Sequence, residues 1–252
     1  MKILITGGGG FLSRGMIIPI AAAGHSLRLM DVTAPDLPPH ECIQGDVTNL
    51  DDVRRSLDGV DGIIINHMAP RTPDSYETPE LCFKINVTGT ANVLQSAVDL
   101  GVKRAVIIST TGFHPPENCQ KWVETIPLDS AKGLYGTSKV CQEALGQQFS
   151  REHGMTISIL RIGYIVNAEI MEDKYGRKIG ERAPLDCDRR DVGEVARLAL
   201  EREDTALDVF PVMSTREAHG IWGTRHTIDR LGWKPRYDFD RLPGPSKAAA
   251  SA

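Results

Sequence analysis

The sequence predicts an α/β fold in which a doubly wound parallel sheet is followed by a small, discontinuous C-terminal region. The main observation is that strand-like apolar runs alternate with helix-like amphipathic stretches through residue 161, separated by glycine-rich or polar turns. Strand, crossover and parallel strand join in a right-handed sense, so repeating this order covers both faces of one sheet. The second observation is length, because 252 residues are enough for a self-supporting core.

The first elements form a strand-helix-strand unit. The run at 3–5 is rich in β-branched residues and leads into four consecutive glycines. The apolar recurrence over 11–23 predicts a helix that closes at Gly24, and 26–30 predicts a second strand ending at Asp31. The unit spans roughly thirty residues, as such motifs require.

The same alternation continues through the middle of the chain. A short strand at 41–45 is followed by a helix at 49–57, whose first turn carries two aspartates that favour a helix N-terminus. The apolar run within 62–66 is typical of a buried parallel strand. Glycines follow the next two helices and favour their ends there. The later elements are expected as helix 81–100, strand 105–109, helix 135–153, strand 156–161 and helix 192–202.

The alternation weakens after residue 161, which suggests a division of the chain. Residues 168–188 are charged and loop-like, and the segments after 205 are short. We therefore expect one large α/β domain and one small region built from separate pieces. The large domain is predicted from 1–161 and 187–204, the small region from 162–186 and 205–243, and a frayed tail from 244–252.

Composition narrows the function. The 29 Lys plus Arg and 33 Asp plus Glu give a formal charge of −4, which offers no electrostatic surface for nucleic acid or an anionic membrane. The five cysteines are widely spaced and have no Cys-x-x-Cys pair, so we expect reduced thiols and no metal site. No apolar run approaches the roughly 20 residues of a membrane span. Small-molecule chemistry in the cytoplasm is the resulting expectation.

The glycine turn predicts a nucleotide site. Gly7 and Gly10 let the backbone approach a pyrophosphate, whose charge is then stabilised by the helix N-terminus. Asp31 lies 21 residues after Gly10, where an acid accepts both hydroxyls of the adenosine ribose and repels a 2′-phosphate. The order of these parts predicts a Rossmann-type domain that binds NAD rather than NADP, whereas glycines alone would indicate only a flexible turn. Ser13 stands where a third glycine is usual, and we expect a slight change of geometry there.

A possible catalytic pair follows in the predicted helix 135–153. Tyr135 and Lys139 are four residues apart and therefore share one helical face. A neighbouring cation stabilises a phenolate and lowers the pKa of the phenol, so Tyr135 can act as a base near neutral pH. Such spacing also arises by chance, and the preceding nucleotide-binding half is what makes it informative.

Together these motifs resemble the extended, epimerase-like branch of the short-chain dehydrogenase/reductase superfamily. Further matching segments are Asn86-Val87-Thr88-Gly89-Thr90, Ser109-Thr110-Thr111 and Leu160-Arg161-Ile162-Gly163. The resemblance implies that the cofactor contacts are Gly7, Gly10, Phe11, Leu12, Asp31, Asp46, Val47, Met68, Ala69, Asn86, Lys139 and Ile162.

The resemblance also implies catalytic roles. Thr110 would hold the substrate oxygen, Tyr135 would exchange its proton, and Lys139 would orient the nicotinamide ribose and tune Tyr135. Thr111 is the neighbouring hydroxyl that also faces substrate in this interpretation. Two adjacent threonines are equally typical of a strand end, so the assignment depends on the Tyr-Lys pair.

Within this branch the chain looks most similar to uronate dehydrogenases, which oxidise a hexuronic acid to its lactone with NAD. A substrate carboxylate favours a guanidinium partner, and Arg177 is predicted to supply it. The alternative is that Arg177 is only a solvated surface charge. His67 is a further substrate-binding candidate, and Arg71 and His114 are weaker ones.

Three other functions stay open. They are a nucleotide-sugar 4-epimerase, another alcohol or ketone oxidoreductase of the branch, and an NAD sensor without turnover. An epimerase is disfavoured because only 113 residues follow Lys139, which leaves little chain to bind a nucleotide. The resemblance further suggests a homodimer or homotetramer packed through the helices at 81–100 and 135–153.

Overall fold

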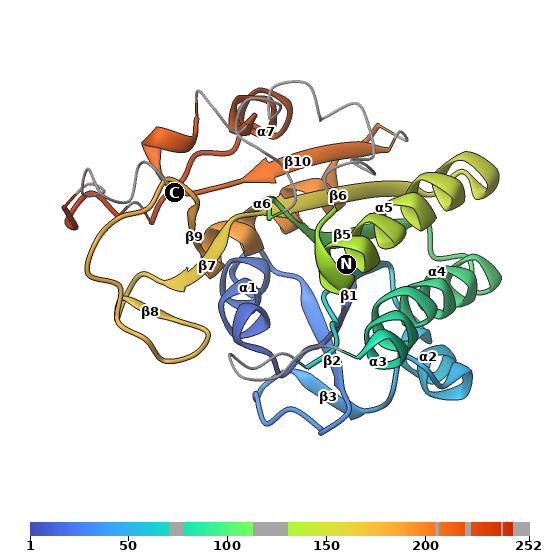
Figure 1. Cartoon of the computed structure of the whole chain (residues 1–252). Helices are drawn as coiled ribbons and strands as arrows, with labels where there is room; N and C mark the ends of the chain where they lie inside the picture. The colour runs from blue at the N-terminus through green and yellow to red at the C-terminus, as the bar shows by residue number, and fades with distance from the viewer. Residues whose placement is uncertain (71–77, 113–130, 205–206, 220–222, 238, 244–252) are drawn as a thin grey trace.

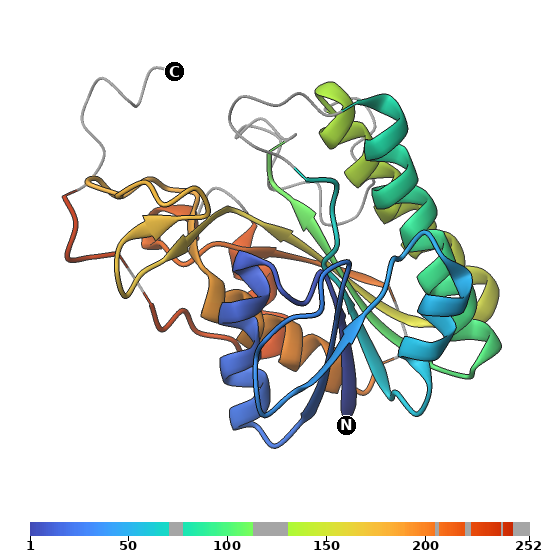
Figure 2. The same cartoon turned by 90° about the horizontal axis from the view of Figure 1, so that it is seen from below.

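The computed structural model describes residues 1–70, 78–112, 131–204, 207–219, 223–237 and 239–243. Figures 1 and 2 show one sheet with helices on both of its faces and a second, small sheet beside it. Within the described residues, no helix combines the length and apolar character that crossing a membrane demands.

The large sheet has seven strands in the order β10-β6-β5-β4-β1-β2-β3, and every neighbouring pair is parallel. Strand order reverses between β1 and β4, which creates the crevice where open α/β sheets bind ligands. The strands are β1 Lys2–Thr6, β2 Ser26–Asp31, β3 Glu41–Gln44, β4 Gly62–Ile65, β5 Arg104–Thr110, β6 Thr156–Ile162 and β10 Asp208–Val212. This architecture confirms the predicted doubly wound α/β fold.

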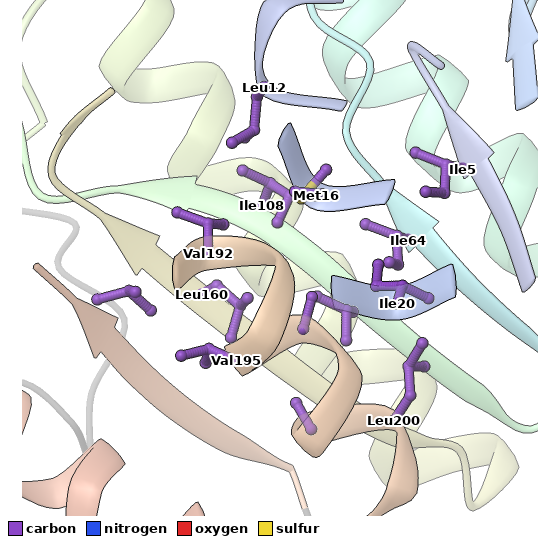
Figure 3. Packing of buried hydrophobic residues seen from close by; sticks show 14 of the residues in the cluster. Ile5, Leu12, Met16, Ile20, Ile64, Ile108, Leu160, Val192, Val195 and Leu200 are labelled. Carbon is purple, nitrogen blue, oxygen red and sulfur yellow. The ribbon is translucent and has the colours of Figure 1, made fainter. Parts of the chain in front are cut away.

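One face of the sheet is covered by α1 (Phe11–Ala22) and α6 (Arg189–Glu201) (Figure 2). The two helices approach closely because Gly193 has no side chain: a Cβ there would lie 2.5 Å from the Cα of Met16. Buried aliphatic side chains fill the space between these helices and the strands (Figure 3). Removing that apolar surface from water is the main stabilising term of this layer.

The other face is covered by α2 (Leu50–Leu57), α4 (Gly89–Asp99) and α5 (Gly133–His153). The predicted helix at 81–100 is a succession of three pieces, α3 (Pro79–Cys82), a π-helical turn η1 (Phe83–Thr88) and α4. π-Helical turns often occur at functional sites, and this one contains Asn86, a predicted cofactor residue.

The segment after residue 161 corrects two expectations. Residues 168–188 were expected as a loop, but part of this range joins β7 (Tyr164–Asn167) in a three-stranded sheet with β8 (Glu172–Asp173) and β9 (Asp186–Asp188). Strands of two to four residues, several of them charged, show no apolar alternation, so only tertiary pairing reveals them.

The second correction concerns β10, which lies in the large sheet although 205–243 was assigned to the small region. Pro211 inside this strand argues against a strand in the sequence, but β10 is an edge strand, where proline is tolerated. Helix α6 also begins at Arg189 rather than 192, because the buried Asp188 side chain caps it by accepting from the amide of Arg190. The remaining helical pieces are η4 Arg216–Ala218 and α7 Thr224–Leu231.

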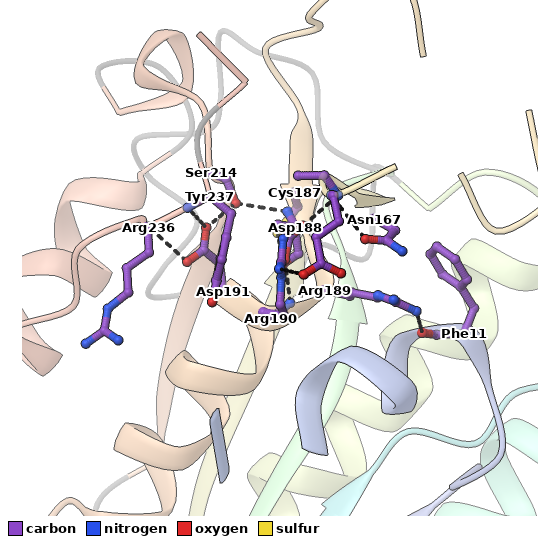
Figure 4. A network of polar contacts seen from close by, with 12 residues as sticks. Phe11, Asn167, Cys187, Asp188, Arg189, Arg190, Asp191, Ser214, Arg236 and Tyr237 are labelled. Atoms are coloured by element: carbon purple, nitrogen blue, oxygen red, sulfur yellow. Dashed lines mark hydrogen bonds and ion pairs between the residues drawn. The ribbon is translucent and has the colours of Figure 1, made fainter. Parts of the chain in front are cut away.

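The segment near residue 236 is fastened to α6 through one buried carboxylate (Figure 4). Asp191 accepts from the backbone amides of Arg236 and Tyr237 at 3.0 and 3.3 Å, and from the Ser214 hydroxyl at 2.7 Å. The guanidinium of Arg190 lies 3.6 Å from the centre of the Tyr237 ring. These contacts hold together α6, the segment after β10 and the C-terminal segment.

Candidate active site

A cavity of about 310 Å³ lies at the carboxyl ends of the strands, at the point where strand order reverses. Its size falls in the range of small-molecule sites. It brings together most of the predicted site residues, namely Gly7, Gly10, Phe11, Leu12, Asp31, Asp46, Val47, His67, Met68, Tyr135, Lys139 and Ile162. It is also lined by residues to which the sequence analysis assigned no site role, including Ser109, Ile165 and Lys174.

The glycine turn forms one wall of the cavity. Gly7 adopts a positive φ of 66°, and a Cβ there would lie 2.9 Å from the carbonyl oxygen of Asn66. Ser13 is buried; its hydroxyl donates to the carbonyl of Gly7 at 2.8 Å and accepts from the side-chain Nδ2 of Asn66 at 2.9 Å. A serine therefore fits where a third glycine is usual, and it ties the turn to the end of β4.

Asp31 ends β2 beside this turn. Its Oδ2 accepts from the amide of Gly9 at 3.0 Å, and its Oδ1 accepts from the amide of Val32 at 2.8 Å. These bonds fix the carboxylate at the cavity edge, which Asp46 and Val47 continue. Asp46 is itself held, since its Oδ1 accepts from the amide of Thr48.

Tyr135 and Lys139 lie at the opposite end of the cavity, on consecutive turns of α5. The Nζ of Lys139 lies 5.8 Å from the centre of the Tyr135 ring and donates to the carbonyl of Ile108 at 2.9 Å. Lys139 is only 3% exposed. Burial lowers the pKa of its ammonium to about 8, because the charged form loses water.

The two predicted threonines lie at and just after the end of β5, but neither lines the cavity. Thr110 Oγ1 accepts from the amide of Gly112 at 3.0 Å, and Thr111 Oγ1 donates to the carbonyl of Ile162 at 3.2 Å. Ser109, one residue earlier, reaches the cavity wall. The substrate role of Thr110 and Thr111 therefore stays a prediction.

His67, Ala69 and Asn86 shape the loop after β4. The Nδ1 of His67 lies 2.9 Å from the hydroxyl of Thr6, and burial lowers the pKa of His67 to about 3, so the ring is neutral. Asn86 does not line the cavity, but its Oδ1 accepts from the amide of Ala69 at 2.7 Å. These contacts favour a role for His67, Ala69 and Asn86 in holding the loop against the cavity, rather than in binding substrate.

Arg177 lies outside the cavity lining, and its guanidinium is engaged elsewhere. Nε donates to Asp173 Oδ2 at 2.7 Å, and Nη2 donates to the Tyr164 hydroxyl, also at 2.7 Å. Asp173 also accepts the backbone amides of Tyr175 and Arg177, which closes a tight turn. The cation of this turn that lines the cavity is Lys174, which sequence reasoning missed because a lysine in a charged segment carries no signal.

Two weaker candidates, Arg71 and His114, lie outside the described residues. Within the described part of the chain, no group of His, Cys, Asp or Glu side chains could hold a metal ion.

The fold and cavity define a dinucleotide-binding protein of the Rossmann type with a tyrosine-lysine pair at one end of its crevice. The family model for the NAD dependent epimerase/dehydratase family matches residues 3–181, and the chain belongs to this family. The cofactor of this family is NAD, and two similar structures have been solved with NAD bound. The glycine wall at Gly7 and Gly10, without side chains, and the fixed Asp31 carboxylate fit such a dinucleotide.

Two relatives match nearly the whole chain. L-arabinose 1-dehydrogenase (NAD(P)(+)) of Haloferax volcanii is 28% identical, covering 93% of this chain and 96% of the relative. The structure of uronate dehydrogenase from Agrobacterium tumefaciens in complex with NAD is 25% identical, with a TM-score of 0.76, covering 98% of this chain and 91% of that one.

Other relatives match less of the sequence or only the fold. A 3 beta-hydroxysteroid dehydrogenase/Delta 5-->4-isomerase of Mycobacterium tuberculosis is 33% identical over 56% of this chain, and the match spans 41% of the relative's length. UDP-N-acetylglucosamine 4-epimerase from Bacillus cereus has a TM-score of 0.74 at 18% identity, covering 96% of this chain and 94% of that one. This second likeness shows the fold alone.

Proposed function

We propose that this protein is an NAD-dependent dehydrogenase that oxidises the anomeric hydroxyl of a sugar acid, most simply a hexuronic acid, to its lactone. The observation that carries the proposal is the pairing of Tyr135 and Lys139 at one end of the cavity with a second cation, Lys174, on the cavity wall. Two of the relatives that match nearly the whole chain, a uronate dehydrogenase and an L-arabinose 1-dehydrogenase, support a sugar substrate.

The residues at this end of the cavity would divide the chemistry among them. NAD would be held by the glycine turn and Asp31 and would supply the hydride acceptor for the anomeric carbon. The Tyr135 phenolate removes the proton of the anomeric hydroxyl, and the Lys139 ammonium stabilises that phenolate by its charge. Thr110, at the end of β5, would hold the reacting oxygen. The products are the lactone, reduced NAD and a proton on Tyr135.

A carboxylate substrate needs a cation near the cavity. Lys174 meets this need, because it lines the cavity and the Asp173 turn fixes its backbone. A lysine ammonium binds a carboxylate as a point charge. We therefore transfer the substrate role first predicted for Arg177 to Lys174.

A nucleotide-sugar 4-epimerase is the second candidate. Solved epimerases share this fold, as the Bacillus cereus enzyme illustrates, but that likeness is below 20% identity. The two functions differ in one readout: a dehydrogenase releases NADH in proportion to substrate consumed, whereas an epimerase returns the hydride and releases none.

The experiment follows NADH formation from NAD with three groups of compounds, free uronic acids, neutral aldoses and nucleotide sugars. Turnover of a uronate supports the proposal, and turnover of neutral aldoses alone removes the acidic substrate from it. Conversion of a nucleotide sugar without NADH release identifies an epimerase. Absence of turnover with NAD still bound in a thermal-shift measurement contradicts the sugar chemistry.

We also infer a homodimer or homotetramer formed through α4 and α5, as the family resemblance implies. The described cysteines Cys42, Cys82, Cys141 and Cys187 are all free thiols, which supports a reducing, cytoplasmic location. Light scattering of the purified protein and fractionation of the cells that make it test these two inferences.

A further inference from the structure

A buried ion pair lies directly behind the Tyr135-Lys139 pair. Glu143 stands one helical turn after Lys139 on α5, and its carboxylate accepts from Arg161 Nη2 at 2.6 Å and from Nε at 3.0 Å. Both side chains are 0% exposed. Burying two charges costs desolvation free energy that a well-packed apolar pair would avoid, so this ion pair is poorly explained by stability alone.

The pair is also tied to the end of strand β5. Ser109 lies directly opposite Arg161 in the β5-β6 register, and its hydroxyl donates to Glu143 Oε1 at 2.5 Å. One residue earlier, the carbonyl of Ile108 accepts from Lys139. Two successive residues of β5 are thus bonded to two successive turns of α5. The next residue of the strand is Thr110, and the preceding turn of the helix carries Tyr135.

We propose that Glu143 is a positioning residue of the reaction: with Ser109 and Arg161 it fixes α5 against the end of β5, and its negative charge, one helical turn from Lys139, favours the charged form of that lysine. The inference rests on the roles proposed above for Tyr135 and Lys139. Glu143 itself is not among the residues that line the cavity. It acts through the register of the helix and through the electrostatic field at Lys139.

The electrostatic part of the proposal concerns the pKa of Lys139, which can be measured. Burial lowers the pKa of Lys139 most strongly, the Glu143 carboxylate raises it, and the Lys174 ammonium lowers it. Glu143 therefore counteracts the loss of water that burial imposes. The titratable and charged groups that surround Lys139 are Tyr135 and Glu143 on α5, Cys82 on α3, His67 after β4, Arg161 on β6 and Lys174 beside β8.

The test is a direct titration of Lys139 in the folded, substrate-free protein. Lysine labelled with ¹³C at Cε reports each ammonium by NMR, and the Lys139→Arg variant identifies the Lys139 resonance. Glu143→Gln is expected to lower the Lys139 midpoint by about 1 pH unit, since a charge partner within a few ångströms shifts a pKa by that order. Arg161→Gln is expected to raise it, because the Glu143 charge is then no longer shared. Glu152→Gln, the same change at an exposed site of α5, is the matched control and leaves the midpoint unchanged.

The Lys139 midpoint is expected to shift in opposite directions in Glu143→Gln and Arg161→Gln. General disruption of the structure would instead shift the midpoint in the same direction in both variants. If Glu143→Gln does not fold, Glu143→Gln/Arg161→Gln is compared with Arg161→Gln, and the proposal requires the lower midpoint in the double variant. An unchanged midpoint on removal of Glu143 overturns the electrostatic part of the proposal.

Kinetics test the positioning part with the substrate found in the panel. Ser109→Ala keeps both charges, so it is expected to lower kcat about tenfold with the KM for NAD unchanged. An unchanged kcat overturns the positioning part. If no uronate is turned over but the Lys139 midpoints shift as predicted, only the proposed function is contradicted. Uronate turnover with an unmoved Lys139 would contradict only the electrostatic inference.

Discussion

Asp173 Oδ2 accepts a hydrogen bond from Arg177 Nε at 2.7 Å. Arg177, predicted to bind a substrate carboxylate, is therefore part of the turn that places Lys174 on the cavity wall. Asp173 is almost fully buried, whereas the Arg177 side chain is 60% exposed. Its hydrogen bonds to Tyr164 and Arg177 hold the pKa of the Asp173 carboxyl well below its usual range, despite the opposing effect of burial. The turn is therefore charged and closed at neutral pH, and its cation toward the cavity is Lys174.

Replacing Lys174 and replacing Arg177 should affect different properties of the protein. Lys174→Met is expected to lower kcat/KM for a uronate by about 10- to 100-fold while leaving a neutral aldose nearly unaffected, because a charged hydrogen bond to the carboxylate is lost. Arg177→Met is expected to lower the melting temperature by loosening the turn. Steady-state kinetics with both substrate types and thermal unfolding measure this. Equal losses on the acidic and the neutral sugar in Lys174→Met would contradict the assignment.

Tyr135→Phe removes only the phenolic oxygen. We expect kcat to fall by about 10²–10⁴, as for loss of a general base, with NAD affinity little changed because the ring remains on the cavity wall. NAD titration by calorimetry alongside the rate measurement separates the two effects. A variant with a near-normal rate would show that Tyr135 is not the base.

Asp31→Ala removes the carboxylate that the amides of Gly9 and Val32 hold at the cavity edge. NAD affinity is expected to fall about tenfold, and discrimination against NADP is expected to shrink because the repulsion of a 2′-phosphate is lost. Dissociation constants for both cofactors measure this. Asp51→Ala, an exposed aspartate in the first turn of α2, is the control. Unchanged cofactor preference would argue that Asp31 does not contact the ribose.

Asp186 provides a prediction for stability against pH. Burial raises the pKa of this carboxyl to about 6 in the folded protein, from an ordinary value of 3.8. Between these values the folded protein holds a proton that the unfolded chain has released, so this group's contribution to stability declines as pH rises from about 4 to 6. Asp186→Asn has no such titration. The melting temperature of the variant relative to the parent is expected to rise over this range, and a constant difference would contradict the raised pKa.

The sequence was sufficient for the parts of the molecule that local chemistry specifies. The alternation of strand-like and helix-like stretches predicted the doubly wound sheet. The glycine turn, Asp31 and the Tyr135-Lys139 spacing predicted residues that line its cavity, because turns and helical faces are properties of neighbouring residues. The small sheet and β10 were missed because their strands are short or contain Pro211, and only pairing with distant segments forms them. Lys174 was missed for a different reason: a lysine in a charged segment gives no sign of which cation lines the cavity, and the Asp173 turn determines this.

The proposed function requires that the protein oxidise an acidic sugar with NAD. The most direct measurement is the rate of NADH formation with a hexuronic acid, compared with the corresponding neutral aldose, in the parent protein and in Lys174→Met. We expect faster turnover of the acid in the parent and loss of that preference in the variant. Equal rates on both sugars in the parent, or an acid preference that survives in Lys174→Met, would contradict it.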